Sequence, residues 1–249
     1  MSGPTISDAA IDLIVRCEVT SEATYLHRYS YPTRPGGMSG VTIGIGYDLG
    51  QVTASQFLAD WSGAGLSDAV ENRLAACCGV KGEAAIPLAR GLADITIPWA
   101  AALAVFRGVS LPAYTRATVA AIPGADRLPP DCLGALVSLA YNRGAGGFTT
   151  NDDRRREMRA IRAAIIDGHP QAVPGQLRAM KRLWVQNPEA PPDKWVPMKD
   201  LAGLLARRDA EADLFERGLA SVAASEPAPT APIPVHVVGD APVEREARG

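Results

Sequence analysis

The chain lacks several features that would place it in a common class at once. None of its apolar runs approaches the ~18–20 residues that a membrane-spanning helix requires. Residues 1–8 hold no basic patch leading into an apolar stretch, as a secretory signal would. An excess of one charge is also absent, since 25 basic and 27 acidic residues give a net charge of −2. We therefore expect no integral membrane segment, no signal peptide and no nucleic-acid partner.

Clustered metal ligands and phosphate-binding loops are missing too. Three histidines and four cysteines are scattered, without a C-x-x-C spacing, so we expect no metal site. The glycines at 44, 46 and 50 have neither the spacing nor the following helix of a dinucleotide-binding loop, and no G-K-[ST] occurs. The sequence therefore predicts no cofactor.

Composition divides the chain into a folded part and a tail. Apolar residues make up 47% of the 249 residues, enough to bury a sizeable core. From residue 226 onward there are five prolines in 24 residues and no helical periodicity. We expect residues 1–225 to form one domain, a monomer, and residues 226–249 to form a flexible Pro/Ala-rich tail.

Most of the folded part has helical periodicity. Apolar residues recur at intervals of three and four from Ile6 to Cys17, with Ser7 as the N-cap, so a first helix should end near Glu18. Thr53 and Gln56 form a capping box that opens another helix. Further helices are expected at about 67–78, 83–93, 98–121 with an interruption at Pro112, 130–142, 153–167, 171–185 and 199–221. The segment 131–141 is apolar nearly all round and should lie in the middle of a bundle.

Residues 19–50 have a different composition. Tyrosines, β-branched residues, Pro32, Pro35 and the pair Gly36-Gly37 predict a β-hairpin that ends in a strand around 41–45. The predicted fold class is α+β, predominantly helical. A small hairpin lobe would span about 19–60 and a larger helical lobe about 66–221.

Two carboxyl groups are candidates for acid–base chemistry. Glu18 falls at the end of the first helix, where the negative helix end and partial burial favour the protonated form of a carboxyl group. Asp48 falls in a polar turn between glycines, where a carboxylate stays ionised, and Thr42 precedes it in the hairpin. Two carboxyl groups in different environments are what the hydrolysis of a glycosidic bond requires.

Three motifs in order resemble phage-type lysozymes (glycoside hydrolase family 24 and its relatives). They are Glu18 followed by TIGIGYDLG at 42–50, ALVSLAYNRGAGGF at 135–148, and LAGLLARRDAEADLF at 201–215. The resemblance covers about residues 6–220. It implies a lysozyme-like fold and a muramidase that cleaves the β-1,4 bond between N-acetylmuramic acid and N-acetylglucosamine in peptidoglycan.

The position of the second carboxylate departs from most of that family. The usual catalytic aspartate lies between the Glu and the Thr, but residues 19–41 contain no aspartate. An aspartate after the Thr resembles the pesticin-type muramidases, and Asp48 matches it. The resemblance thus implies Glu18 as general acid, Thr42 as a residue that orients water and Asp48 as base, with Glu22 as the fallback for Asp48. A water between the carboxyl groups would imply inversion and a separation of roughly 6.5–9.5 Å, against about 5 Å for a retaining enzyme.

Further residues are predicted to support this site. In similar enzymes an arginine of the closing helix reaches the catalytic Glu, which favours Arg207, although an i,i+4 pair with Glu211 on a solvated face is an equal alternative. Asn142 would cap the end of the buried helix or contact substrate. Tyr31 and Tyr47 would line the cleft or pack in the core.

Other activities and the route to the substrate stay open. A lytic transglycosylase would use one Glu and no base, and a catalytically silent module would bind the wall or a protein. The segment 154–182 has a net charge of +6, either a solvated face or a surface attracted to the acidic wall. The expected partners are peptidoglycan strands. Synthesis in the cytoplasm without a signal peptide implies a holin, secretion machinery or uptake as a bacteriocin, with an immunity protein in the toxin cases.

Overall fold

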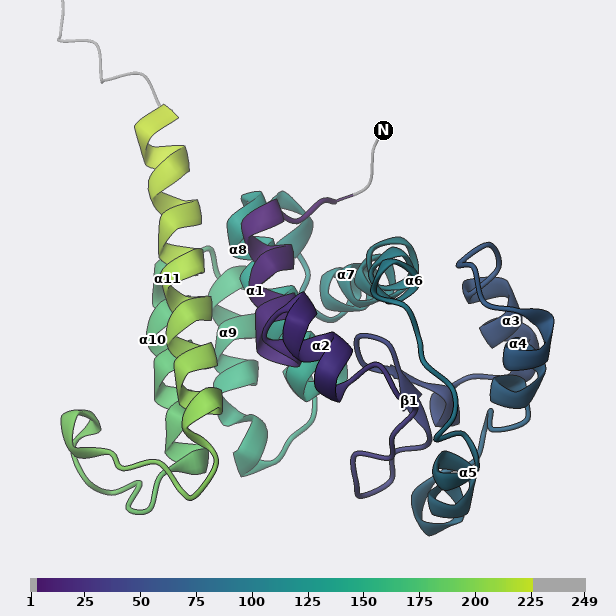
Figure 1. The fold of residues 1–249 in the computed structure, drawn as a ribbon. Coiled ribbons are helices and arrows are strands. Elements are labelled where there is room, and N and C mark those ends of the chain that lie inside the picture. Colours follow the sequence, from purple (N-terminus) through teal and green to yellow (C-terminus); the bar gives the residue numbers. More distant parts are fainter. Residues whose placement is uncertain (1–3, 226–249) are drawn as a thin grey trace, which may run out of the picture.

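The computed structural model describes residues 4–225 as a predominantly helical fold with one small sheet (Figure 1). Strands β1 (Thr42–Ile43) and β2 (Tyr47–Asp48) pair in antiparallel fashion, with Thr42 opposite Asp48 and Ile43 opposite Tyr47. The α+β class predicted from the sequence is thus confirmed at this level. The predicted tail at 226–249 lies outside the described residues.

Helix α8 (Pro130–Arg143) lies at the centre of the larger helical part. Every residue from Cys132 to Ala140 is buried, as expected for a helix that is apolar on all sides. Helices α1 (Asp8–Val19), α7 (Leu111–Ala121) and α11 (Ala202–Ser225) pack around it. The prediction of a central buried helix at 130–142 is confirmed.

Small residues set how closely these helices approach one another. A Cβ atom on Gly134 of α8 would lie 2.2 Å from the Cβ of Ala10 on α1. A Cβ on Gly218 of α11 would lie 2.6 Å from Cys132 Sγ. Both crossings therefore depend on glycine. They allow α1 and α11 to pack closely against the same helix, α8.

We expect the Gly134→Ala variant to be destabilised by about 1–3 kcal/mol, because the added methyl must push α1 away from α8. Urea unfolding measures this free energy. The matched control is Gly175→Ala in α10 (Val173–Ala179), where an added Cβ meets nothing within 4 Å and should be neutral or slightly stabilising. Equal stabilities of the two variants would contradict the packing argument.

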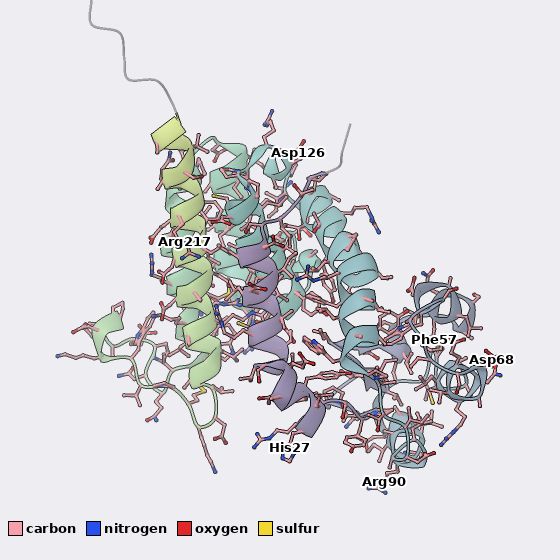
Figure 2. The ribbon with its side chains drawn as sticks, turned by 45° about the horizontal axis from the view of Figure 1, so that its top comes forward. His27, Phe57, Asp68, Arg90, Asp126 and Arg217 are labelled. Carbon is pink, nitrogen blue, oxygen red and sulfur yellow. The ribbon has the colours of Figure 1, made fainter. Side chains whose placement is uncertain are left out.

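The hairpin lies beside a second group of helices on the right of Figure 1. These helices are α3 (Ala54–Asp60), α4 (Asp68–Ala75) and α5 (Ala85–Gly91). Figure 2 shows Phe57, Asp68 and Arg90 on this side of the molecule and Arg217 of α11 on the other. Helix α6 (Trp99–Val105) and α7 lie between the two groups (Figure 1).

The expectation of hairpin structure throughout residues 19–50 is wrong for its first part. Helix α2 (Glu22–Arg28) forms there, capped by Ser21, whose hydroxyl accepts a hydrogen bond from the Thr24 amide. An acidic residue in its first turn and basic residues in its last turn suit the helix dipole. The strand expected at 41–45 is also shorter, because regular pairing is confined to two residues of each strand.

Pro112 does not interrupt the helix expected at 98–121. Helices α6 and α7 are joined by a π-helical turn over Phe106–Ser110, and Pro112 lies in the first turn of α7. Proline lacks an N–H and its ring clashes with the carbonyl four residues before it. The wider turn just before Pro112 accommodates both effects without ending the helix.

The other predicted helices are present with shifted ends. Thr53 caps α3 by accepting the Gln56 amide, but the Gln56 side chain bonds Asp60 at 2.6 Å, so only half of the capping box forms. The segment 153–167 is a 3₁₀ turn followed by α9 (Arg156–Ile166), and 171–185 contains α10 followed by a 3₁₀ segment at Met180–Trp184. Within residues 4–225, no helix is long and apolar enough to cross a membrane.

Candidate active site

Glu18 lies one residue before the end of α1, and the chain reverses directly behind it. Thr20 has φ 66° and ψ −58°, and the Ser21 amide donates to the Val19 carbonyl at 2.7 Å, which defines a γ-turn. A β-branched residue at positive φ is strained by about 1–3 kcal/mol. This turn joins the end of α1 directly to α2, immediately after the candidate acid.

Arg207 of α11 holds the Glu18 carboxylate. Its Nη1 donates to Glu18 Oε1 at 2.7 Å, its Nη2 to the Ser138 carbonyl at 2.9 Å, and its Nε to Glu211 Oε1 at 3.2 Å. The contact predicted for Arg207 is therefore present. The i,i+4 pair with Glu211 also forms, but it is buried, so the alternative of a solvated face is wrong. One guanidinium joins α1, α8 and α11 at the candidate site.

The network is buried and balanced in charge. Glu211 Oε1 also accepts hydrogen bonds from Ser138 Oγ at 2.6 Å and Arg208 Nη2 at 2.8 Å. Two arginines thus face two glutamates. Burial lowers the pKa of Arg207, but the charges of Glu211 and Glu18 outweigh this effect, so its pKa is raised. Glu18 is the exposed end of the network, with 25% of its side chain accessible against 4% for Arg207.

Two pockets meet at Glu18. The first, which we call the hairpin pocket, has a volume of about 310 Å³. It is lined by Glu18, Val19, Arg28, Tyr29, Thr33, Pro35, Thr42, Gly44 and Gly46. The second, the α11 pocket, has a volume of about 540 Å³ and lies between α1, the end of α8 and the start of α11. Glu18 can therefore meet a ligand from the hairpin side or from the α11 side.

Thr42 lines the hairpin pocket and is fixed between two neighbouring segments. Its amide donates to the Thr33 carbonyl at 2.6 Å, the Thr33 amide donates back at 3.0 Å, and Asp48 pairs with it on the other side. Directly opposed residues of an antiparallel pair project from the same face, with Cβ atoms about 4.5–5.5 Å apart. Asp48 thus stands next to Thr42 on the face that borders the pocket.

The Asp48 carboxylate is half-buried and tied to the backbone. Its Oδ1 accepts the Gly50 amide at 2.8 Å and the Gly40 amide at 3.0 Å, and its Oδ2 accepts from Gln51 Nε2 at 3.4 Å. The two glycines touch, since a Cβ on Gly40 would lie 2.6 Å from Gly50 Cα. Asp48 therefore also holds the base of the hairpin, a structural role that the sequence did not reveal.

Two tyrosines lie behind the two carboxylates. Tyr141 of α8 donates to the Ile45 carbonyl in the hairpin loop at 2.5 Å, and its ring contacts that of Tyr114 at a centroid distance of 4.5 Å. Burial raises the pKa of Tyr114, and the charges of both Glu18 and Asp48 raise it further. Tyr114 is therefore within electrostatic reach of both candidate carboxylates.

The remaining predicted residues differ in their placement. Tyr47 does not line the cleft: it is buried against Phe57 and Trp61, and its hydroxyl donates to Asp60 at 2.6 Å. Tyr31 is 45% exposed. The aromatic residue in the hairpin pocket is Tyr29.

Asn142 and Glu22 are both exposed. Asn142 lies within α8 and lines the α11 pocket. The prediction that Asn142 caps α8 is wrong, because the C-cap is Gly144, which has a positive φ of 78°. Glycine has no Cβ to oppose it. Glu22 lies in the first turn of α2.

The residues that sequence analysis missed are Arg28 and Tyr29 in the hairpin pocket and the buried Ser138, whose hydroxyl lies between Arg207 and Glu211. A signal for the first two existed, because Ser21, Glu22 and the basic pair at 27–28 have the order of a capped helix. Among residues 4–225, no three or more His, Cys, Asp or Glu side chains are grouped so that they could hold a metal ion.

Four of the eight basic side chains at 154–182 form ion pairs within the fold, and Arg156 is one of them. Arg178 pairs with Asp213 and Glu216 of α11, and Lys181 pairs with Asp209. Arg182 pairs with Asp153 and Glu157. The other four basic side chains of the stretch form no ion pair among residues 4–225, so a solvated face and a surface attracted to the acidic wall both stay predictions.

The comparisons with known proteins cover only part of the chain. A family model described as a domain of unknown function (DUF8812) matches residues 18–110, less than half of the sequence. The matched segment begins at Glu18 and includes Thr42 and Asp48, and it ends before Arg207. A comparison with curated proteins finds no match.

Proposed function

We propose that the chain has a lysozyme-like fold and is a muramidase that hydrolyses the β-1,4 bond between N-acetylmuramic acid and N-acetylglucosamine in peptidoglycan. One observation carries the proposal. A partly exposed Glu18, oriented by buried Arg207, borders the same pocket as Thr42, and Thr42 pairs with Asp48. The proposal is supported by an acid at a helix end that shares a pocket with Thr42, whose partner in the hairpin, Asp48, carries the second carboxylate.

In the proposed reaction, Glu18 in its protonated form donates a proton to the leaving glycosidic oxygen. Arg207 binds Oε1, and within residues 4–225 no side chain hydrogen-bonds Oε2, so Oε2 is the oxygen to which we assign the transferred proton. Asp48 accepts a proton from a water that Thr42 helps to orient, and this water attacks the anomeric carbon. General acid–base catalysis of this kind contributes about 10²–10⁴-fold.

A second candidate, a lytic transglycosylase, is favoured by the hydrogen bonds of Asp48. Both amides on Oδ1 engage this carboxylate in the hairpin, and Asp48 does not itself line the hairpin pocket. An enzyme without a base would form an internal anhydro ring on the muramic acid residue instead of adding water.

Mass spectrometry of the products released from purified sacculi distinguishes the candidates. The proposed hydrolase releases new reducing sugar ends. Anhydro-muramic ends would assign the transglycosylase, and binding to sacculi without any new sugar ends would leave a module that only binds the wall.

We expect Asp48→Asn to lower the rate of hydrolysis by about 10²-fold, because the variant loses the base. Asparagine Oδ1 can still accept the Gly40 and Gly50 amides, so the free energy of unfolding in urea should change by no more than about 1 kcal/mol. The matched control is Asp60→Asn, which removes a carboxylate bonded to Tyr47 on the far side of the hairpin. Unchanged hydrolysis by Asp48→Asn would exclude Asp48 as the base.

A further inference from the structure

The end of α2 brings two side chains into the hairpin pocket that the proposed reaction does not use. Arg28 and Tyr29 line this pocket together with Glu18 and Thr42. Their position is fixed one turn earlier by Tyr25, which is fully buried, contacts the Trp99 ring at a centroid distance of 5.2 Å and donates to the Ile97 carbonyl at 2.9 Å. Arg28 is thus presented by an anchored helix.

The charge of Arg28 has no counterpart in the fold. Glu18 and Arg28 are the charged residues that line the pocket, and Glu18 is already paired with Arg207. Among residues 4–225, no carboxylate forms an ion pair with Arg28. By contrast Arg34, on the same side of the hairpin, contacts Glu83 and the Gly37 carbonyl. The pocket therefore offers an unneutralised guanidinium to a ligand.

The surroundings of Arg28 suit a sugar. Tyr29 is 41% exposed and offers an aromatic face beside the guanidinium. Gly44 and Gly46 line the same pocket with backbone atoms, since an added Cβ on either would meet aromatic side chains packed behind the hairpin. A guanidinium beside an aromatic ring and bare backbone fits a sugar that carries a carboxylate better than a neutral sugar.

From this arrangement we infer that Arg28 binds a carboxylate of the glycan strand in the hairpin pocket and selects acidic over neutral polysaccharide. The inference rests on the proposed function and adds a specificity residue to it. The carboxylate has two sources. In intact peptidoglycan it belongs to the peptide stems, whereas in glycan stripped of its peptides it is the lactyl group of muramic acid.

Binding by a protein that cannot turn over separates this inference from catalysis. Kd values are measured for Glu18→Gln and for Glu18→Gln with Arg28→Gln on three soluble glycans: peptide-bearing strands, strands stripped by an amidase, and stripped strands with their carboxyl groups converted to methylamides. A neutral N-acetylglucosamine oligomer is the reference. Arg217→Gln, an exposed arginine of α11 far from the end of α2 (Figure 2), is the matched control.

Arg28→Gln should weaken binding to a carboxylate-bearing strand by about tenfold and leave the methylamide and neutral glycans unchanged. The strand affected identifies the source, stem peptide or lactyl group. Arg28→Lys should restore part of the loss, since it keeps the charge without the bidentate geometry. Equal Kd values for the proteins with and without Arg28 on every carboxylate-bearing strand would overturn this inference and leave the proposed function standing. Binding of none of the glycans overturns it together with the proposed function.

Discussion

Replacing Glu18 with glutamine is expected to lower the release of reducing ends from purified sacculi by about 10³-fold. Glutamine has nearly the same shape, and its Oε1 can still accept the hydrogen bond that Arg207 Nη1 donates at 2.7 Å. It has no proton acidic enough to give to the leaving oxygen. The variant should therefore fold and bind glycan but not cleave it, which separates loss of chemistry from loss of structure.

The matched control for Glu18→Gln is Glu22→Gln, four residues further along the chain. Glu22 is exposed in the first turn of α2, so its replacement should leave cleavage within about twofold of the wild-type rate. Full lysis by the Glu18→Gln protein would end the muramidase proposal. Loss of activity in Glu22→Gln would instead identify Glu22 as the second carboxylate.

Replacing Arg207 with methionine is expected to cost about 3–5 kcal/mol of stability, because it removes one partner from a buried ion network. The guanidinium is 4% exposed, and its loss leaves Glu211 with a single arginine and removes the hydrogen bond that Arg207 donates to the Ser138 carbonyl. Glu18 also loses its contact with α11. Urea unfolding of wild type and variant gives the difference in free energy directly.

An exposed set of ion pairs between α10 and α11 provides the comparison for Arg207. Arg178 of α10 reaches Glu216 and Asp213 of α11, with 37% of its side chain exposed. Exposed pairs contribute about 0–1 kcal/mol, so Arg178→Met should be close to neutral. An equal loss of unfolding free energy in Arg207→Met and Arg178→Met would contradict the claim that burial makes the Arg207 network more stabilising than an exposed pair.

Helices marked by an N-cap residue or by apolar residues at the helical period could be predicted from the sequence. The apolar residues of 131–141 predicted the buried centre, Ser7 predicted the start of α1, and Thr53 predicted the start of α3. In each case the signal is local: a hydroxyl that caps free amides, or apolar residues repeated at the helical period. Such local signals can be identified in the sequence without knowing which elements pack beside the helix.

Elements whose conformation depends on a neighbour were not predictable. The short α2 was missed because its composition also suits a hairpin, and the contact of Tyr25 with Ile97 and Trp99 stabilises the helix. For Tyr47 the sequence leaves both the cleft and the core open. Its partners Phe57, Trp61 and Asp60 decide for the core.

The amino-acid order by itself determined that Glu18 ends a helix, that Thr42 and Asp48 belong to a glycine-rich hairpin, and that Arg207 lies on a closing helix. Only the tertiary structure decided that Arg207 touches Glu18, 189 residues away, and that Asp48 also binds the Gly40 and Gly50 amides. Capping and periodicity act over a few neighbouring residues. A buried charge network forms only when glycine-mediated packing brings distant helices within hydrogen-bond distance.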